Sequence, residues 1–336
     1  MKVFEIREFG LDKLALADRE AQRPGAGEVL VRMKAASLNY RDYMVVQGTY
    51  NPKMKLPMIP LSDGAGVVEE VGESVTRFKK GDRVAACFMQ KWIDGPPTPE
   101  KGASALGGAI DGVLRESAVF SEAGLVSIPD QLSFEEAAAL PCAAVTAWHA
   151  LFEHSPMAPG ETVLLQGTGG VSIFALQFAN AAGLRTIVTS SSDGKLARAR
   201  ELGANETVNY KKTPNWDEES RKLTGGAGVD HIVEVGGSDT MPRSLRAIRT
   251  GGAISVIGVL SGKESSVSPA SILMNSVRLQ GIYVGSRAMF ERMNRAISFH
   301  QIRPVIDKVF PWLEAPAALQ YFAKQQHFGK ICFQFE

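Results

Sequence analysis

The strongest constraint on the fold is a series of short apolar segments between residues 162 and 284 that alternate with helical segments. The apolar segments predict six strands, at residues 162–166, 186–190, 206–209, 229–235, 253–257 and 279–284. Strands that alternate with helices of this length specify a parallel, doubly wound α/β sheet. Six such strands are the number that a complete dinucleotide-binding fold contains.

The first predicted strand leads into a glycine-rich turn and then into a helix that continues to Asn180. Glycines permit a tight turn and let a pyrophosphate approach the backbone, and the N–H groups at the helix start attract its charge. The spacing departs from a full Gly-x-Gly-x-x-Gly, because Ser172 or Ile173 stands where the third glycine is expected. The prediction of a dinucleotide site therefore rests on the position of this turn between a strand and a helix of a βαβ unit. The predicted cofactor contacts are Gly167, Thr168, Gly169, Gly170 and Val171. A turn that serves chain geometry alone is the alternative.

The end of the second predicted strand indicates which dinucleotide is bound. An NAD-selective site carries an acid here for the ribose 2′-hydroxyl, but this chain has Thr189-Ser190-Ser191-Ser192. Small hydroxyls can donate to a 2′-phosphate, and Lys195 can neutralise it. We therefore expect NADPH rather than NADH, with Ser190, Ser191 and Lys195 as contacts. The alternative is that the serines cap the next helix and Lys195 is a surface charge.

The first third of the chain predicts a β-rich domain. Its strands are expected at residues 28–33, 66–71, 83–88 and 118–120. The Gly- and Pro-rich residues 94–112 predict a long surface loop.

A capping box at Ser133 predicts the start of a helix that runs towards Phe152, with a break at Pro141. A helix at 289–300 and a strand at 330–335 do not extend the alternating pattern, so we expect them to return to the first domain. The predicted domains are residues 1–126 with 287–336, and residues 127–286.

Composition excludes several classes of function. The chain has 336 residues, 45% of them apolar, and a net charge of +1, which favours neither nucleic acid nor an anionic membrane as partner. Charges interrupt the first residues, and no apolar run approaches the ~20 residues that span a bilayer. Cys87, Cys142 and Cys332 are scattered, which is typical of a reducing compartment. We expect a soluble, cytoplasmic protein that acts on a small molecule.

Several short motifs occur in order along the chain. They are Ala36-Ser37-Leu38-Asn39-Tyr40-Arg41-Asp42, Gly64-Ala65-Gly66-Val67-Val68, Gly81-Asp82-Arg83-Val84, Ala139-Leu140-Pro141-Cys142, Thr146-Ala147-Trp148 and Glu201-Leu202-Gly203-Ala204. With these motifs the whole chain resembles the medium-chain dehydrogenase/reductase superfamily, and particularly its zinc-free quinone oxidoreductase-like branch. The resemblance implies a Rossmann domain and a β-rich, GroES-like catalytic domain.

The resemblance also indicates where a catalytic zinc would bind. The ligand positions of the zinc alcohol dehydrogenases fall here on Asn39, on Ser62-Asp63 and on Cys142. One thiolate with Asn and Ser cannot form the three-ligand site that catalysis needs. The structural zinc lobe would fall in the 94–112 loop, which has no cysteine. We expect neither metal, and Cys142 is then a small apolar residue.

Hydride transfer from NADPH to a quinone or an α,β-unsaturated carbonyl compound needs no metal, because conjugation carries the developing charge to an oxygen that a neutral donor can stabilise. By resemblance, Asn39 contacts the nicotinamide ribose. Tyr50 resembles the proton donor of metal-free enoyl reductases, and Tyr43 lies on the same segment. A substrate wall at Tyr50, with water as the proton source, is an equal alternative. Arg41 and Asp42 are more typical of a structural pair.

The resemblance implies further cofactor contacts near the carboxyl ends of the strands. They are Tyr210, Gly258, Val284 and Ser286, and Thr146, at a helix turn that in the family faces the glycine loop, is a further one. A core threonine and ordinary edge packing are the alternatives for Thr146 and Tyr210.

Two other functions stay open from the sequence. One is an alcohol dehydrogenase-type enzyme that acts on alcohols or aldehydes. The other is a non-catalytic NADPH-binding sensor or structural protein. The last predicted strand, residues 278–285, would pair with its twin across a two-fold axis, which predicts a homodimer.

Overall fold

The computed structural model describes residues 1–262 and 267–336, and the chain divides into two units. Unit 1 consists of Met1–Val145 and Val284–Glu336, and unit 2 of Thr146–Tyr283. In the described part of the chain, no helix combines the length and the apolar character that crossing a membrane requires.

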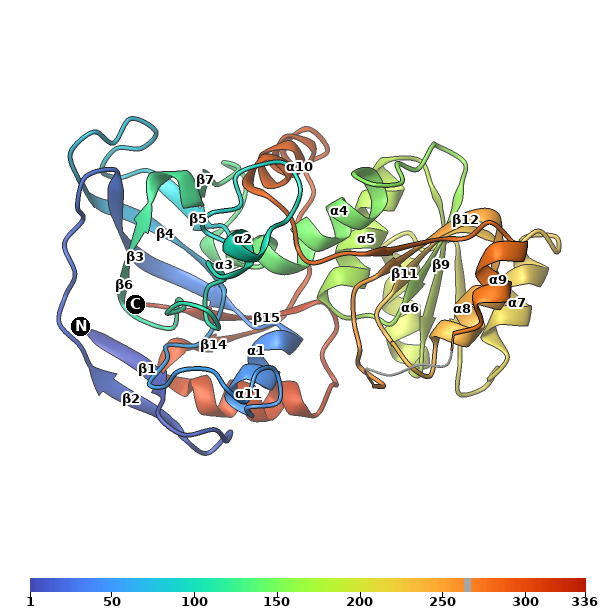
Figure 1. Cartoon of the computed structure of the whole chain (residues 1–336), viewed down its shortest axis with the longest axis horizontal. Coiled ribbons are helices and arrows are strands. Elements are labelled where there is room, and N and C mark those ends of the chain that lie inside the picture. The colour runs from blue at the N-terminus through green and yellow to red at the C-terminus, as the bar shows by residue number, and fades with distance from the viewer. Residues whose placement is uncertain (263–266) are drawn as a thin grey trace. The chain divides into compact units, whose positions relative to one another are not determined.

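Unit 2 is built on a six-stranded, all-parallel sheet, which confirms the predicted doubly wound fold (Figure 1). Its strands are β8 (Thr162–Gln166), β9 (Arg185–Ser190), β10 (Glu206–Asn209), β11 (Val229–Glu234), β12 (Ile248–Val256) and β13 (Arg278–Gly281). Their order is β10-β9-β8-β11-β12-β13, so the chain reverses its direction of growth between β8 and β11. Ligands of open α/β sheets bind at such a switch point, beyond the carboxyl ends of the strands.

Helices cover this sheet. They are α4 (Val145–Phe152), α5 (Gly170–Ala181), α6 (Asp193–Glu201), α7 (Trp216–Leu223), α8 (Met241–Ala247) and α9 (Pro269–Met274). Helices α5 and α6 pack against β8, β9 and β10, and α8 packs against β11 and β12. The core between the layers contains Leu164, Ile187, Ile232 and Ile254, one from each of four strands. Burial of these apolar side chains on both faces explains why the strands are continuous apolar runs.

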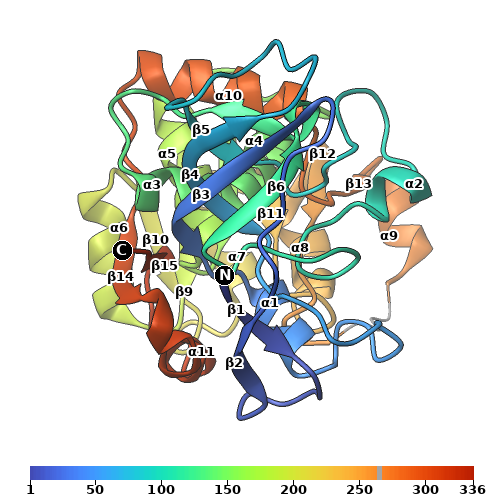
Figure 2. The same cartoon turned by 90° about the vertical axis from the view of Figure 1, so that its left-hand side faces the viewer.

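Unit 1 contains a larger sheet that is mostly antiparallel (Figure 2). Its strands are β3 (Glu28–Ser37), β4 (Asp63–Val71), β5 (Arg83–Ala86), β6 (Ser117–Ser121), β7 (Leu125–Ser127), β14 (Ile306–Pro311) and β15 (Lys330–Gln334). Strand β3 is central, because β4 pairs along one edge while β6 and β15 share the other. The pair β1 (Lys2–Ile6) and β2 (Leu14–Asp18), which the sequence did not predict, forms a separate ribbon.

The C-terminal strand returns to the first sheet, as predicted. Strand β15 pairs antiparallel with residues 35–37 of β3, so Lys330 lies at the strand start nearest to the end of β3. Strand β14, which pairs parallel with β15, was not predicted.

The remaining helices of unit 1 are short, apart from α10. They are α1 (Tyr40–Val46), α2 (Pro99–Gly102), α3 (Phe134–Ala138), α10 (Arg287–Phe299) and α11 (Ala315–Ala323), with 3-10 turns at Glu122–Gly124 and Trp312–Glu314. The capping box is present, because Ser133 Oγ accepts from Glu136 N–H at 3.2 Å and Glu136 accepts from Ser133 N–H at 2.8 Å.

The predicted break at Pro141 takes the form of a π-helical turn at Leu140–Ala144, between α3 and α4. Proline has no N–H to continue the α-helical ladder, so the chain widens there. Helix α3 packs against β3 and β4, and the contact-based unit 1 includes residues up to Val145.

Candidate active site

The glycine turn follows β8 directly and opens onto free space. Gly167 has a φ of 74°, in the left-handed region that favours glycine. A Cβ added at Gly167 or Gly169 would meet no atom of the described residues within 4 Å. Ser172 closes the turn by donating to the Gln166 carbonyl at 2.6 Å. A phosphate group could therefore approach this backbone closely.

The start of α5 has the features of an anion site. Its N-cap is Gly169, which provides no side-chain acceptor for the first N–H groups of the helix. The helix runs for 12 residues, so its backbone dipoles add to the attraction for negative charge. Thr168 is buried within the turn, and Val171 is half-buried on the first turn of the helix.

The serines after β9 differ in their roles: one caps the next helix, and another is only half-buried. Ser192 caps α6 by accepting from Lys195 N–H at 3.4 Å, as the simpler alternative expected. Ser190 is buried and accepts from Ser192 N–H, while Ser191 is half-buried. Tyr210 lies beside them, because its N–H donates to the Ser190 carbonyl at 3.1 Å. The structure thus brings Ser190 and Tyr210 to one edge of the sheet.

An acid that the sequence analysis overlooked lies at the same edge. Asp193 begins α6, and its carboxylate accepts from Lys212 Nζ at 2.6 Å and from Asn209 Nδ2 at 2.7 Å. The hydrogen bonds from Lys212 and Asn209 hold the pKa of Asp193 below its usual value. The charge next to the expected phosphate position is therefore already paired.

A buried polar network holds the loop after β11. Glu234 is fully buried, and Gln166 Nε2 and Thr240 Oγ1 donate to it at 2.7 and 2.6 Å. The backbone N–H groups of Gly236 and Gly237 also donate to this carboxylate. Gly258 packs tightly on the loop, since a Cβ there would lie 2.2 Å from the Val235 carbonyl oxygen. This glycine, predicted as a cofactor contact, allows the loops after β11 and β12 to meet.

Three more predicted contacts lie near the start of a helix or just before one. Thr146 is buried near the start of α4. Val284 has a φ of 57°, a rare conformation for a β-branched residue that is typical of functional sites. Ser286 caps α10 by accepting from Met289 N–H at 3.2 Å.

In unit 1, Asn39 sits between the end of β3 and the start of α1, of which it is the N-cap. Its side-chain Oδ1 accepts from the ammonium of Lys330 at 2.6 Å, and the same ammonium donates to the Leu38 carbonyl at 2.7 Å. Asn39 and Lys330 are only 8% and 3% exposed. Lys330 was not among the predicted site residues, although a lysine at the start of a predicted buried strand is unusual.

Asp63, the first residue of β4, lies next to this pair. It accepts from Ser62 Oγ at 2.7 Å and from Cys142 N–H at 3.1 Å, and its carboxylate is 3.9 Å from Lys330 Nζ. Burial raises the pKa of Asp63, while the ammonium of Lys330 and the amide of Asn39 oppose that rise.

Arg41 and Asp42 form a second buried ion pair on α1. Arg41 Nη1 lies 3.3 Å from Asp42 Oδ1 and donates to the Leu106 carbonyl at 2.6 Å. Asp42 also accepts from Asn39 N–H at 2.9 Å. Burial raises the pKa of Asp42 to about 6, although Arg41 opposes it. We call Arg41, Asp42, Asp63 and Lys330 the buried charge cluster.

The two candidate tyrosines differ in their surroundings. Tyr43 packs between Tyr40 and Phe322, and its hydroxyl accepts from Gln47 Nε2 at 2.9 Å. Tyr50 is half-buried, and the guanidinium of Arg41 lies over its ring, 5.3 Å from the centroid. Arg41 thus links Tyr50 to the buried charge cluster.

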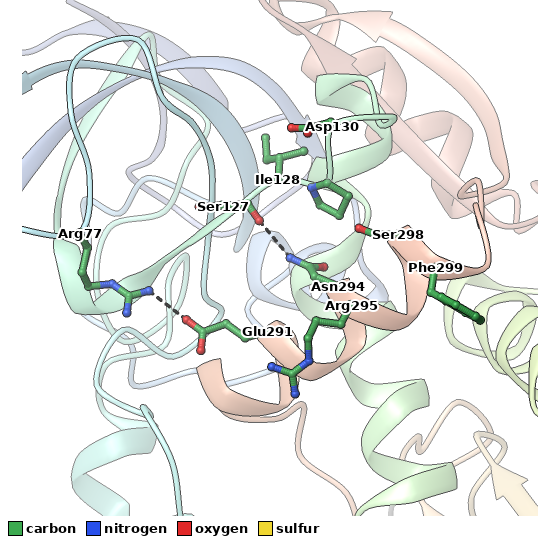
Figure 3. A pocket seen from close by; sticks show the side chains of 10 residues that line it. Arg77, Ser127, Ile128, Asp130, Glu291, Asn294, Arg295, Ser298 and Phe299 are labelled. Carbon is green, nitrogen blue, oxygen red and sulfur yellow. Dashed lines mark hydrogen bonds and ion pairs between the residues drawn. The ribbon is translucent and has the colours of Figure 1, made fainter.

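The hollow in Figure 3 contains none of the predicted site residues. It has a volume of about 780 Å³ and is lined by α10 and by the chain around β7. Arg77 and Glu291 form an ion pair across it at 2.9 Å, and Asn294 donates to the Ser127 carbonyl at 3.1 Å. These contacts explain the hollow as a feature of how α10 packs on unit 1.

Both units match known protein families. Residues 25–130 match the alcohol dehydrogenase GroES-like domain, and residues 170–299 match the zinc-binding dehydrogenase family.

Individual relatives extend over nearly the whole chain. A zinc-type alcohol dehydrogenase-like protein of Schizosaccharomyces pombe is 47% identical over 97% of this chain and 96% of its own length. The quinone oxidoreductase of Rattus norvegicus is 28% identical over 95% of this chain and 92% of its own. The crystal structure of an NAD-dependent alcohol dehydrogenase superposes with a TM-score of 0.91 at 34% identity, covering 99% of both chains.

Proposed function

Because the chain belongs to the medium-chain dehydrogenase/reductase superfamily and is an oxidoreductase of that type, we propose that it transfers hydride from NADPH to a quinone or an α,β-unsaturated carbonyl compound, without a catalytic metal. We assign the dinucleotide to unit 2 and the groups that contact the substrate to unit 1. The observation that carries the metal-free part of the proposal is the position of the Lys330 ammonium against Asn39 and Asp63.

A catalytic zinc fits the residues around Asn39 poorly. Catalytic zinc takes three protein ligands, each with a lone pair directed at the metal. Here the Asn39 carbonyl oxygen is already bound to an ammonium at 2.6 Å, and the Asp63 carboxylate is 3.9 Å from the same ammonium. A dication between them would meet a fixed positive charge. No step of the mechanism is therefore assigned to zinc.

A phosphorylated dinucleotide fits the described residues of unit 2 well. The open turn at Gly167 and Gly169 and the uncapped start of α5 suit its pyrophosphate. Ser190, Ser191, Lys195 and Tyr210 would surround the 2′-phosphate. Asp193, an acid at this edge, is ion-paired with Lys212 and accepts a hydrogen bond from Asn209, which supports NADPH over NADH.

The reduced nicotinamide supplies the hydride when the cofactor is bound. The chain's own contribution is to orient the reactants and to move a proton. Asn39 Nδ2 is a buried donor that lacks a hydrogen-bond acceptor within the described ranges, so an oxygen of a bound ligand would satisfy it. Tyr50, or water beside it, delivers the proton that accompanies the hydride.

A second candidate is oxidation of an alcohol or reduction of an aldehyde. The relative at 47% identity favours it, because that protein is named as alcohol dehydrogenase-like. An isolated alcohol offers no conjugated system to carry charge, so this reaction depends more on a Lewis acid.

One experiment separates these functions. Purified protein of known metal content would be titrated with NADPH and NADH, then assayed with enones, quinones and alcohols at saturating cofactor. We expect tighter binding of NADPH, and oxidation of it by enones or quinones that a zinc chelator leaves unchanged. Chelator-sensitive alcohol oxidation would establish the second candidate instead. Tight binding without turnover of any substrate would favour a non-catalytic NADPH-binding protein.

We further propose that the enzyme is a homodimer formed through β13. This strand is at the edge of its sheet, and pairing with a second copy would extend the ladder. Large apolar side chains are exposed nearby, with Leu273 and Met274 more than three-quarters exposed. Light scattering should give twice the mass of the chain, and the mass of a monomer would contradict the proposal.

A further inference from the structure

We propose that Lys330 is a positioning residue whose buried ammonium fixes the Asn39 amide, so that Asn39 offers a bound dinucleotide only an N–H donor. The inference rests on the proposed function in one respect, namely that Asn39 contacts the cofactor. The expected acceptor is a hydroxyl oxygen of the nicotinamide ribose.

The contacts of Lys330 leave little freedom to either side chain. An ammonium has three hydrogens, and two of them bind Asn39 Oδ1 at 2.6 Å and the Leu38 carbonyl at 2.7 Å. The ammonium also faces Asp63, 3.9 Å away. With Lys330 only 3% exposed, water does not compete for these contacts.

This arrangement decides which end of the amide is available. An asparagine side chain can present either its oxygen or its NH₂ group, and the two differ little in shape. Reversing Asn39 would place its NH₂ group against an ammonium, which pairs donor with donor. The charge-assisted bond to Oδ1 therefore holds the amide in one orientation.

The remaining end of the amide needs a partner. Within residues 1–262 and 267–336, Asn39 Nδ2 is buried without an acceptor in hydrogen-bonding geometry. The amide also faces the Asp63 carboxylate and helps to lower the pKa of that group, but an NH₂ group carries two hydrogens, so one can face Asp63 while the other is left for a ligand. Buried donors are rarely left unsatisfied, so this atom marks where a ligand oxygen would bind.

The lysine thus supplies a fixed positive charge where metal-dependent relatives hold a cation. Its charge is balanced inside the protein by Asp63, so no ion from solution is required. Fixing a neighbouring side chain in the geometry that ligand binding needs reduces the ordering required on binding.

The sharpest test is Asn39→Asp, which keeps an oxygen for Lys330 and turns the NH₂ group into a second oxygen. The change preserves the shape of the side chain, but the new carboxylate faces the buried Asp63 as well as the ammonium, so the melting temperature is measured beside the affinity and Asn39→Ala serves as the uncharged companion. We expect the dissociation constant for NADPH, measured by fluorescence titration, to rise at least about tenfold. Binding as tight as in the wild type would overturn the proposal.

A double-mutant cycle tests whether Lys330 acts through Asn39. Lys330→Met and Asn39→Ala should each weaken NADPH binding about tenfold, and the double variant should bind no more weakly than Asn39→Ala alone. Additive losses would mean that Lys330 acts independently of Asn39, which would overturn the inference.

The variant Lys330→Met/Asp63→Asn controls for folding, because it removes the ion pair without leaving a lone buried charge. We expect its melting temperature to recover towards that of the wild type while NADPH affinity stays low. Recovery of both would show that Lys330 serves charge balance alone. If Asn39→Ala and Asn39→Asp both bind NADPH normally, the inference fails. If the wild type binds NADPH but reduces no enone or quinone, the proposed function fails while the cycle can still be measured.

Discussion

The dinucleotide turn of unit 2 and the buried charge cluster of unit 1 prepare for a ligand in different ways. The turn uses backbone N–H groups and open space, and its key residues follow one another along the chain. The cluster uses four ionisable side chains that come from three distant parts of the sequence, on α1, β4 and β15. The geometry of a site built from backbone N–H groups changes little when nearby side chains are substituted. A set of buried charges destabilises the fold when one member is removed, because the remaining charges are left without an oppositely charged partner.

The largest expected effect is on the free energy of unfolding. It is tested by replacing one lysine with methionine in the buried charge cluster and one at the dinucleotide edge of unit 2. Lys330→Met removes an ammonium that is 3% exposed and leaves Asp63 without its cation. Breaking a buried ion pair in this way costs about 3–5 kcal/mol in the free energy of unfolding. Lys212→Met removes the partner of Asp193, an exposed pair that solvent screens.

Urea unfolding of both variants would measure the difference. We expect a much lower midpoint for Lys330→Met and almost no change for Lys212→Met. Similar midpoints for the two would mean that the buried charge cluster is no more sensitive than an exposed pair.

The next largest effect concerns the proton in unit 1. Tyr50→Phe removes the hydroxyl group and keeps the ring under Arg41, and loss of a general acid lowers turnover about 100-fold or more while NADPH binding stays nearly intact. Tyr40→Phe is the matched control, since Tyr40 lies in α1, shortly before Tyr50, and its ring packs on Tyr43 and on Phe322 of α11. Equal turnover in the wild type and in Tyr50→Phe would assign the proton to water, and a selective loss in Tyr43→Phe would assign it to Tyr43.

A smaller and more specific effect is expected at the dinucleotide edge of unit 2. Ser190→Asp places a carboxylate beside the expected 2′-phosphate. We expect the ratio of NADPH to NADH affinity to fall about tenfold or more through charge repulsion. Ser190→Asn has nearly the same shape without the charge and should keep most of the ratio. If both variants keep the wild-type ratio, the 2′-phosphate lies elsewhere.

The same contrast explains what the sequence could predict. The six parallel strands and the glycine turn depend on local patterns, so their residues could be located within a few positions. The end of β9 was also predicted, but the ion-paired Asp193 was overlooked because its partners lie at another strand: Asn209 ends β10 and Lys212 follows it. Local periodicity shows which residues a strand buries. It does not show which side chains meet across a sheet.

The buried charge cluster could not be predicted by those means. Asn39 was singled out, yet its partner Lys330 lies 291 positions along the chain and reaches it only because β15 pairs with β3. The short strands β1, β2 and β14 were overlooked for a related reason. Their pairing partners, and not a strong alternation of their own, hold them in place.

The smallest expected effect is the pH dependence that Asp42 gives to the free energy of unfolding. Burial raises the pKa of Asp42 from an ordinary value of 3.8 to about 6. Between these values the folded protein keeps a proton that the unfolded chain has released. The contribution of Asp42 to stability is therefore fully present below about pH 4 and is lost as the pH rises through about 6.

Asp42→Asn cannot titrate, so the difference in unfolding free energy between wild type and variant should change across that window and be constant above it. Asp63, whose pKa is also raised by burial, faces Asp42 in the wild type, so the measured difference contains the interaction of the two carboxyl groups as well as the titration of Asp42. Denaturant unfolding at several pH values from 4 to 8 would measure the difference. A constant difference throughout would mean that Arg41 keeps Asp42 charged at all of these pH values, and that the cluster is two full ion pairs rather than one pair beside a carboxyl that readily takes a proton.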